Sequence, residues 1–405
     1  MPESRPRTEH DRSGAGPWLR LTALGASAAA VFAVVSGAAG YDGAHRLVAA
    51  LALPPLVALA VGAWLSHRPL LAPAVSALGL FGVAALVTPE GAHLALAAIA
   101  LTATLVAAAL AHRDREPAGG SWRDYVTLTK PRVMTLLLLT GFCGMVAGAR
   151  GLPPAGVAVA AMVGLALACG GASAINHVID RDIDRLMGDR TRSRPVAADR
   201  IAPAHALEFG LALSALSFTL LAGAVNVLTA VLALVGNLFY VLVYSRWLKR
   251  STPQNIVIGG AAGAVPPVVG WAAATGDVTL GAILLFLIVL VWTPPHFWAL
   301  ALLIRRDYAA AGIPMLPVVR GEQETTRQIV LYSLALVGIS LLPFAFGYSG
   351  YAYLATAVLL GVWFLVLAWQ LRRRPTPRRA AGLFKYSMAY LALLFVAVAL
   401  DPVVL

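Results

Sequence analysis

Charged residues are scarce in this chain, where Asp, Glu, Lys and Arg together make up 12% of the 405 residues. Soluble globular domains carry about twice that share. Apolar residues reach 59% of the sequence, which excludes an ordinary soluble protein and predicts a membrane protein. Cysteine is rarer still. Cys143 and Cys169 both lie inside apolar runs, so we interpret them as packing residues and not as a disulfide framework.

Long apolar runs dominate the rest of the sequence. One membrane-crossing helix needs roughly 20 apolar residues. About thirteen segments meet that length, and they lie near 21–40, 46–65, 70–88, 92–111, 133–149, 154–175, 206–223, 226–245, 255–274, 279–303, 328–346, 351–371 and 382–400. We therefore predict an all-α polytopic membrane protein with a disordered cytoplasmic tail (1–20), a four-helix membrane extension (21–120) and a nine-helix domain (121–405).

The positive charges follow the predicted alternation of loops. Of the 31 Lys and Arg residues, 29 fall in the tail and in loops on one side, and only Arg46 and Arg150 fall on the other. Because cytoplasmic loops are enriched in Lys and Arg, we expect the amino terminus and these loops inside the cell and the carboxyl terminus outside. This topology accounts for the net charge of +12, so we expect no nucleic-acid partner.

Three polar residues recur at a spacing of four where a predicted membrane helix enters an inside loop. Asn176, Asp180 and Asp184 would share one side of a continuing helix. Two stacked carboxylates repel each other, and an amide oxygen with two carboxylates is a hard ligand set that suits Mg²⁺. The alternative is a solvated helix end, in which these acids pair with Arg181 and Arg185.

Other charged residues lie in loops on the same side. Guanidinium groups can bind phosphate oxygens through paired hydrogen bonds, although such arginines also arise as topology signals. The candidate residues for binding a diphosphate or a metal are Arg190, Arg192, Arg194, Tyr244, Lys249, Arg250, Arg306 and Asp307. Their convergence on one membrane surface predicts a metal–diphosphate site there.

At these positions the sequence resembles the UbiA-type intramembrane prenyltransferases, and within them the protoheme farnesyltransferases, or heme o synthases. The resemblance runs from about Tyr125 to the carboxyl terminus and leaves the amino-terminal extension outside. It rests on LTKPRV at 128–133, N-x-x-x-D-x-x-x-D at 176–184, the stretch around 190–195, LKRSTPQNIVIGGAAGAVPPVVGW at 248–271, WTPPHFWAL at 292–300 and DYAAAGIPMLPVV at 307–319. The last three segments distinguish this subfamily from prenyltransferases that act on quinone or chlorophyll precursors.

The resemblance implies a nine-helix prenyltransferase bundle in the plasma membrane of a prokaryote. Its substrates would be farnesyl diphosphate and heme b, its product heme o, and its metal Mg²⁺. Asn176, Asp180 and Asp184 would hold the metal, and basic residues such as Lys249 would stabilise the leaving diphosphate. The second acid-rich motif of the superfamily is reduced here to Asp307. Possible partners are heme a synthase and oxidase assembly proteins.

Three histidines are candidate heme contacts. His296 lies near the inside end of its helix and could ligate or orient heme iron, or could make a structural hydrogen bond. His45 and His93 start the second and fourth predicted helices at the same outer membrane level. They could ligate one bound heme, in weak likeness to half of a heme a synthase, or could be ordinary interfacial residues.

Two other functions remain open. One is prenylation of an aromatic quinone precursor by the same kind of site. The other is a secondary transporter, since such proteins also combine many helices with polar residues in the membrane. A transporter is expected to place these residues near the bilayer centre in two repeated halves, whereas here they gather at one surface.

Overall fold

The computed structural model describes Ala23, Ala26 and residues 120–404. The tail at 1–20 and, apart from those two alanines, the four-helix extension at 21–120 lie outside the described residues, as do His45 and His93. Residues 120–404 are helical with short connections, which confirms the all-α prediction for this part of the chain.

The described helices follow one another along the chain with few long loops. They are α5 (Trp122–Leu128), α6 (Pro131–Ala149), α7 (Ala155–Ile179), α8 (Arg181–Leu186), α9 (Asp189–Arg192), α10 (Pro203–Ala224), α11 (Val227–Leu238), the π-helix η3 (Phe239–Leu248), α12 (Lys249–Ser251), α13 (Asn255–Thr275), α14 (Leu280–Leu303), α15 (Arg305–Ala310), α16 (Leu316–Val319), α17 (Gly321–Ala345), α18 (Tyr351–Arg373) and α19 (Pro377–Val404). Within 120–404, nine helices are long and apolar enough to cross a membrane, with α11, η3 and α12 counted as one. The nine-helix prediction is confirmed.

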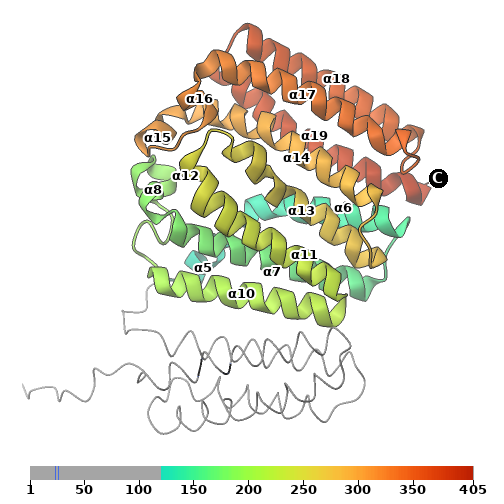
Figure 1. Cartoon of the computed structure of the whole chain (residues 1–405), viewed down its shortest axis with the longest axis horizontal. Helices are drawn as coiled ribbons and strands as arrows, with labels where there is room; N and C mark the ends of the chain where they lie inside the picture. Colours follow the sequence, from blue (N-terminus) through green and yellow to red (C-terminus); the bar gives the residue numbers. More distant parts are fainter. Residues whose placement is uncertain (1–22, 24–25, 27–119, 405) are drawn as a thin grey trace, which may run out of the picture. The chain divides into compact units, whose positions relative to one another are not determined.

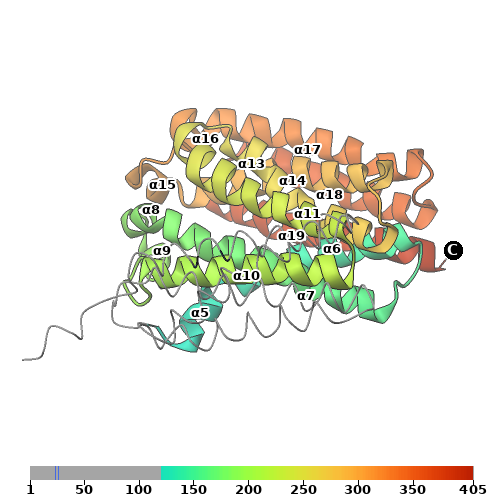
Figure 2. The same ribbon diagram turned by 60° about the horizontal axis from the view of Figure 1, so that its bottom comes forward.

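The long helices form a bundle in which α13 and α14 lie innermost (Figure 1, Figure 2). α13 packs against α6, α11 and α14, and α14 packs in turn against α17 and α19. α7 and α10 pack together on one side, and α17, α18 and α19 form a group on the other. The core therefore runs along the bundle, and the short helices α8, α9, α12, α15 and α16 are left to cover one end.

Glycine lets α6 and α13 approach closely. A Cβ atom at Gly270 would clash with the carbonyl oxygen of Gly141, and one at Gly144 would clash with the carbonyl oxygen of Pro267. Close backbone contact of this kind is how small residues hold membrane helices together. It keeps α13 central, so that its first turn is held firmly at the end of the bundle that carries the short helices.

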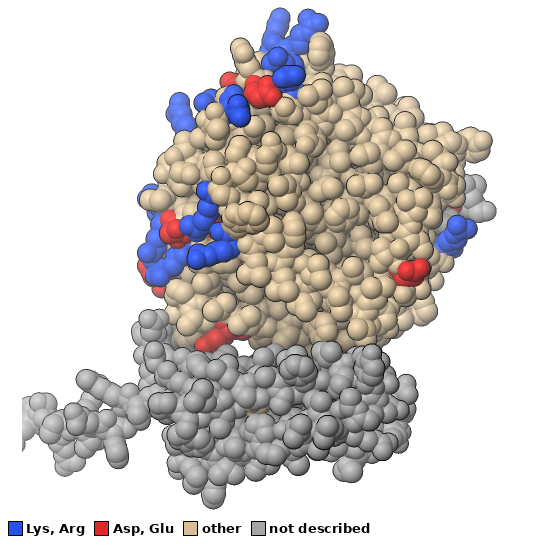
Figure 3. Space-filling view, in the orientation of Figure 1, with Lys and Arg blue, Asp and Glu red and all other residues tan. Residues whose placement is uncertain are grey.

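The two ends of the bundle differ sharply in charge. We call the end with α8, α12 and α15 the charged end. Lys and Arg gather on this side in Figure 3, while most of the face of the long helices seen there is free of charged side chains. In the loops at the opposite end of the described bundle, the charged residues are Arg150 and Asp277. Large apolar side chains such as Leu359 and Trp363 are exposed on the flanks, as expected of a surface that faces lipid. This part of the chain is a multi-pass membrane protein.

A π-helix carries the fourth span to the charged end. Within η3 the main chain follows the wider i to i+5 hydrogen-bond pattern, and the N–H of Lys249 donates to the carbonyl oxygen of Tyr244. Ser245 and Lys249 are both buried against α7 as a result. Such π segments are frequent at functional sites.

Candidate active site

A buried set of polar side chains lies at the charged end, where α7 stops. α7 ends at Ile179, and Asp180 links it to α8 with a non-helical backbone. The predicted continuous helix through Asp184 is therefore broken. The main-chain bonds from Asp180 to Asn176 and from Asp184 to Asp180 persist, so the three side chains remain close along the chain.

Asp180 and Lys249 form the centre of this site. The Lys249 Nζ lies 2.5 Å from Asp180 Oδ2, and the two side chains are 9% and 0% exposed. Asn176 Nδ2 donates to the same oxygen at 2.8 Å and to Ser245 Oγ at 2.9 Å. The pair thus links α7 to the η3–α12 junction. The sequence predicted that the acids and the YSRWLKR segment (244–250) lie at the same membrane surface, but not that Asp180 and Lys249 are partners.

Lys130 joins the site from the start of α6. Its Nζ donates to Asn176 Oδ1 at 2.7 Å. Its backbone is left-handed, with φ of 50°, directly before Pro131. That conformation costs roughly 1–2 kcal/mol in a residue with a side chain. Burial, reinforced by the nearby Arg194 guanidinium, lowers the pKa of Lys130 to about 7.

Asp184 and Arg194 complete the group. Arg194 Nη1 lies 2.6 Å from Asp184 Oδ1, and Asp184 is 1% exposed. Burial raises the pKa of Asp184, although Arg194 opposes this effect. Asp180, Asp184, Arg194 and Lys249 all lie near enough to Lys130 to influence its pKa. We call these five residues the buried charge cluster.

Two carboxylate oxygens in this cluster lack partners. Asp180 Oδ1 and Asp184 Oδ2 are buried and accept no hydrogen bond from the described residues. Buried anionic oxygens are normally satisfied. They fit an incoming cation, and the three basic side chains fit an incoming anion. The described residues contain no group of three His, Cys, Asp or Glu side chains with metal-binding spacing, so a metal here would rely on Asn176 and on ligand oxygens as well.

The exposed acids of these loops do not form the pairs expected of a solvated helix end, in which the motif acids would bind Arg181 and Arg185. Arg181 and Arg185 both bind Asp199, at 2.6 Å, and not the acids of the 176–184 motif. Arg250 forms two 2.7 Å bonds to Asp182 and one to the carbonyl oxygen of Ile179. In this structure Arg250 braces the α7–α8 junction, and its predicted role in binding diphosphate stays a prediction.

The remaining predicted residues lie around the cluster or apart from it. Arg192 and Arg306 are exposed, and Arg190 belongs to α9. The carboxylate of Asp307 packs against Gly188, since a Cβ atom there would lie 3.2 Å from Asp307 Oδ2. The segment that carries Asp307, helix α15, therefore reaches the α8–α9 turn.

His296 lies among aromatic side chains. Its ring stacks on Trp292 and on Phe384, at centroid distances of 4.2 and 4.8 Å. Its Nδ1 is 2.6 Å from the Ser387 hydroxyl oxygen. These contacts match the structural hydrogen bond that the sequence left as an alternative, and a role toward heme iron stays a prediction.

Four residues near the site were missed by reasoning from the sequence. Lys130 lay in the LTKPRV motif and Ser245 in the YSRWLKR loop, but neither had a spacing that pointed to Asn176. His177 is buried beside Asn176, and neither ring nitrogen has a partner among the described residues. Asn255, at the start of α13, is also buried, and neither of its amide atoms has a partner there.

A family model described as "UbiA prenyltransferase family" matches residues 137–395. The chain belongs to the UbiA prenyltransferase family. A protein named protoheme IX farnesyltransferase from Symbiobacterium thermophilum is 54% identical over 71% of this chain and 97% of its own length. One of the same name from Thermus thermophilus is 52% identical over 72% of this chain, which spans 48% of that protein.

A third protein of that name, from a Roseiflexus species, is 44% identical over 89% of this chain and 75% of its own length. Residues 121–405 make up a smaller share of the chain than the 89% that this relative matches. The likeness to this relative therefore extends into the amino-terminal region, whereas the family model begins at residue 137, within the range from Tyr125 that the sequence suggested.

Solved structures confirm the fold. One described as digeranylgeranylglyceryl phosphate synthase has a TM-score of 0.59 at 18% identity, over 70% of this chain and 99% of its own. A UbiA homologue from Archaeoglobus fulgidus, bound to DMAPP and Mg²⁺, has a TM-score of 0.51 at 19% identity, over 68% and 99%. At these identities the likeness concerns the helical arrangement alone.

Proposed function

We propose that this chain transfers the farnesyl group of farnesyl diphosphate to a vinyl group of heme b, giving heme o. The relatives that are 44–54% identical carry the name protoheme IX farnesyltransferase. The observation that carries the proposal in the structure is the buried charge cluster, which combines three basic side chains with two unsatisfied carboxylate oxygens. Such a set suits an anionic diphosphate accompanied by a cation.

The basic residues would drive the first step. When the allylic carbon–oxygen bond breaks, its electron pair leaves with the diphosphate, and negative charge grows on the leaving oxygens. Lys130, Lys249 and Arg194 would stabilise that charge from fixed positions, which is the largest contribution that many active sites make. The vinyl π electrons then attack the farnesyl carbon, and water captures the resulting cation and gives up a proton. No protein nucleophile is needed.

The residues also fit Mg²⁺. Asn176, Asp180 and Asp184 would hold the ion, because hard oxygen ligands suit it and two of the carboxylate oxygens lack partners. When bound with the diphosphate, Mg²⁺ would neutralise part of its charge. Asp307, held at the α8–α9 turn, is proposed as a further ligand of the metal, and Arg190, Arg192 and Arg306 are proposed to bind the diphosphate.

The proposed location is the plasma membrane of a prokaryote, with the charged end toward the cytoplasm. The support is the bias of 29 positive residues against two. A reporter that is active only outside the cytoplasm should be active when fused after Leu405 and inactive when inserted at 195–200. The reverse pattern would invert the topology.

Heme analysis tests the function directly. Membranes that contain this protein should convert added protoheme and farnesyl diphosphate into heme o, and chelation of divalent cations should stop the conversion. Control membranes carry the Asp180→Asn variant at equal protein level. Prenylation of an aromatic quinone precursor without conversion of protoheme would support the other acceptor class. Movement of a solute without any prenylated product would indicate a transporter.

The amino-terminal extension is proposed as a separate membrane domain at 21–120 that carries its own heme between His45 and His93. The full chain should then show a low-spin b-type spectrum that His45→Ala and His93→Ala each remove. An unchanged spectrum in both variants would leave this region without a heme role.

A further inference from the structure

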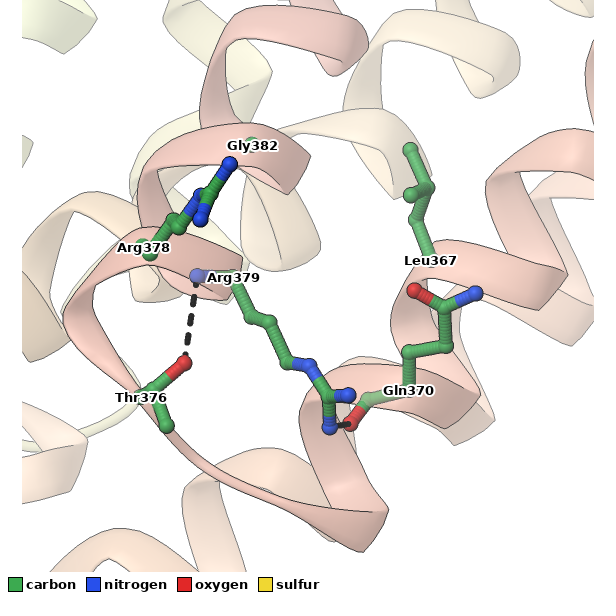
Figure 4. A pocket seen from close by; sticks show the side chains of 6 residues that line it. All are labelled: Leu367, Gln370, Thr376, Arg378, Arg379 and Gly382. Atoms are coloured by element: carbon green, nitrogen blue, oxygen red, sulfur yellow. Dashed lines mark hydrogen bonds between the residues drawn. The ribbon is translucent and has the colours of Figure 1, made fainter.

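A polar pocket of about 330 Å³ lies apart from the buried charge cluster, between the first turn of α13 and the helices α14, α16 and α17. The side chains that line it include Gln254, Trp298, Leu316, Arg320, Glu324 and Gln328. A second cavity, of about 360 Å³, lies at the α18–α19 turn (Figure 4). There Arg379 is already bound to the carbonyl oxygens of Gln370 and Arg374.

The polar pocket collects sequence segments that the diphosphate site does not use. Gln254 belongs to the segment at 248–271, Trp298 to WTPPHFWAL, and Leu316 to DYAAAGIPMLPVV, with Arg320 directly after it. These three segments separate the chain from prenyltransferases that act on other acceptors. Enzymes of one family that share a prenyl diphosphate but differ in acceptor are expected to differ at the acceptor site. The pocket is therefore a candidate for recognising the acceptor.

The pocket contains several hydrogen-bond donors, and one of them, the indole N–H of Trp298, has no partner among the described residues. Trp298 is 2% exposed, and its indole Nε1 donates to no described residue. A buried indole N–H normally has an acceptor. Arg320 is exposed and adds a permanent positive charge, and Gln254 adds an amide. These donors suit a carboxylate.

Glu324 is the one acid among the lining residues named above, and its charge is partly engaged. Its Oε1 accepts a 2.7 Å hydrogen bond from Gln328, and its Oε2 lies 3.4 Å from Arg327. An incoming carboxylate would meet Glu324 as a repulsive neighbour. Removing that repulsion by substitution of Glu324 should therefore change kcat/KM for the acceptor.

A packed group of apolar side chains adjoins both the pocket and the buried charge cluster. Ile183, Ile256, Ala301, Tyr308 and Met315 pack together. Ile183 is the neighbour of Asp184, and Met315 is the neighbour of Leu316. Ala301 lies one helical turn beyond Trp298. The pocket and the buried charge cluster are therefore connected through one packed group of side chains.

We infer that this pocket binds the propionate carboxylates of the heme acceptor, with Arg320 and Trp298 as the principal donors. The inference rests on the proposed function, since heme b carries its vinyl groups and its propionates on different edges of the ring. Holding the propionate edge in the pocket turns a vinyl group toward the buried charge cluster. Arg320 and Trp298 are then determinants of acceptor specificity, and they take no part in breaking the diphosphate bond.

The test compares protoheme with its dimethyl ester, which lacks both negative charges. The full-length wild-type protein in membranes should use the ester with kcat/KM lowered about tenfold or more, the size expected for lost charge-assisted hydrogen bonds. Arg320→Gln and Trp298→Phe should lower kcat/KM for protoheme by a similar factor and leave the ester nearly unchanged. KM for farnesyl diphosphate should not move.

Two further variants separate recognition from structural damage. Glu324→Gln removes the repulsive charge, so kcat/KM should rise for protoheme but not for the ester, whereas a damaged fold would lower both. Arg305→Gln, in the same region but outside the pocket, should keep the wild-type preference. The inference is overturned if Arg320→Gln and Trp298→Phe retain the full preference for protoheme over its ester. If the wild-type protein farnesylates neither compound, the proposed function itself fails.

Discussion

The loops at the charged end hold two kinds of ion pair that look alike in the sequence and differ in the structure. Asp180 and Asp184 face Lys249 and Arg194 in a buried setting, and each acid keeps one oxygen without a partner. Asp199, which lies 15 residues after Asp184, is exposed and binds two arginines through both of its oxygens. The first kind is incomplete and can accept a ligand, whereas the second is already satisfied.

The difference has a physical origin in burial. An exposed ion pair contributes about 0–1 kcal/mol because water screens it, and its loss is tolerated. A buried pair contributes little net stability either, since desolvation offsets the attraction, but removal of one partner leaves an uncompensated charge. The buried charge cluster is therefore sensitive to substitution, and the exposed pairs mainly hold the shape of the loop.

The largest effect is expected from Asp180→Asn or Asp184→Asn. Each removes a charge that the leaving diphosphate and its metal require, so heme o formation should fall by about 10³-fold or more. The apolar helix surfaces are untouched, so the protein should remain in the membrane at normal level. Turnover at the wild-type rate at limiting Mg²⁺ would contradict the assignment of the cluster.

Lys249→Met should have the next largest effect, and it acts on both activity and stability. Activity should fall by about 10²-fold. Stability should fall by about 3–5 kcal/mol, because Asp180 would lose its buried partner. Thermal unfolding in detergent measures the second effect.

The double variant Lys249→Met with Asp180→Asn serves as the matched control for that stability effect. It leaves no unpaired charge, so it should recover most of the lost stability while staying inactive. A double variant as unstable as the single one would mean that Lys249 acts through packing and not through charge.

Arg250→Gln should have an intermediate effect. The side chain braces the α7–α8 junction through Asp182 and the carbonyl oxygen of Ile179. Its loss loosens the position of Asp180 without removing a ligand, and we expect activity to fall by about tenfold or less. Assays of Arg250→Gln and Asp182→Asn side by side measure this, because both break the same brace. A much larger loss in Arg250→Gln alone would support the prediction from the sequence that Arg250 binds diphosphate.

Asp199→Asn should have the smallest effect. Arg181 and Arg185 hold the pKa of Asp199 below its usual value, so the attraction is present at neutral pH and is lost only as the pH falls through the acid range. Activity at neutral pH should stay within about twofold of the wild type, as for other exposed pairs. A loss comparable to that of Asp184→Asn would show that the two kinds of ion pair are not distinct.

Much of this architecture follows from the sequence. The nine spans after residue 120 are visible because each crossing needs a long apolar run, and the charge bias of the loops separates the two ends. Asn176, Asp180 and Lys249 were found through motifs that carry polar residues at membrane helix ends. The start of α17 was misjudged by the most, since polar residues from Gly321 onward still form helix.

The pairing of side chains was harder to predict. Lys130 is 46 residues from Asn176 and meets it only because α6 and α7 pack together. Arg250 and Asp182 are 68 residues apart, so no local spacing reveals that they are partners. The break at Asp180 was also hidden, because Asn176, Asp180 and Asp184 keep a helical spacing in the sequence.

The π-helix η3 constrains how this part of the chain can change its length during evolution. One residue corresponds to a rotation of about 100° in a regular α-helix. Deleting a single residue within Phe239–Leu248 without any other change would rotate Lys249 about the helix axis and turn its amine away from Asp180. The π-helix thus keeps the Lys249 amine in place. We expect this span to tolerate substitutions far more readily than deletions.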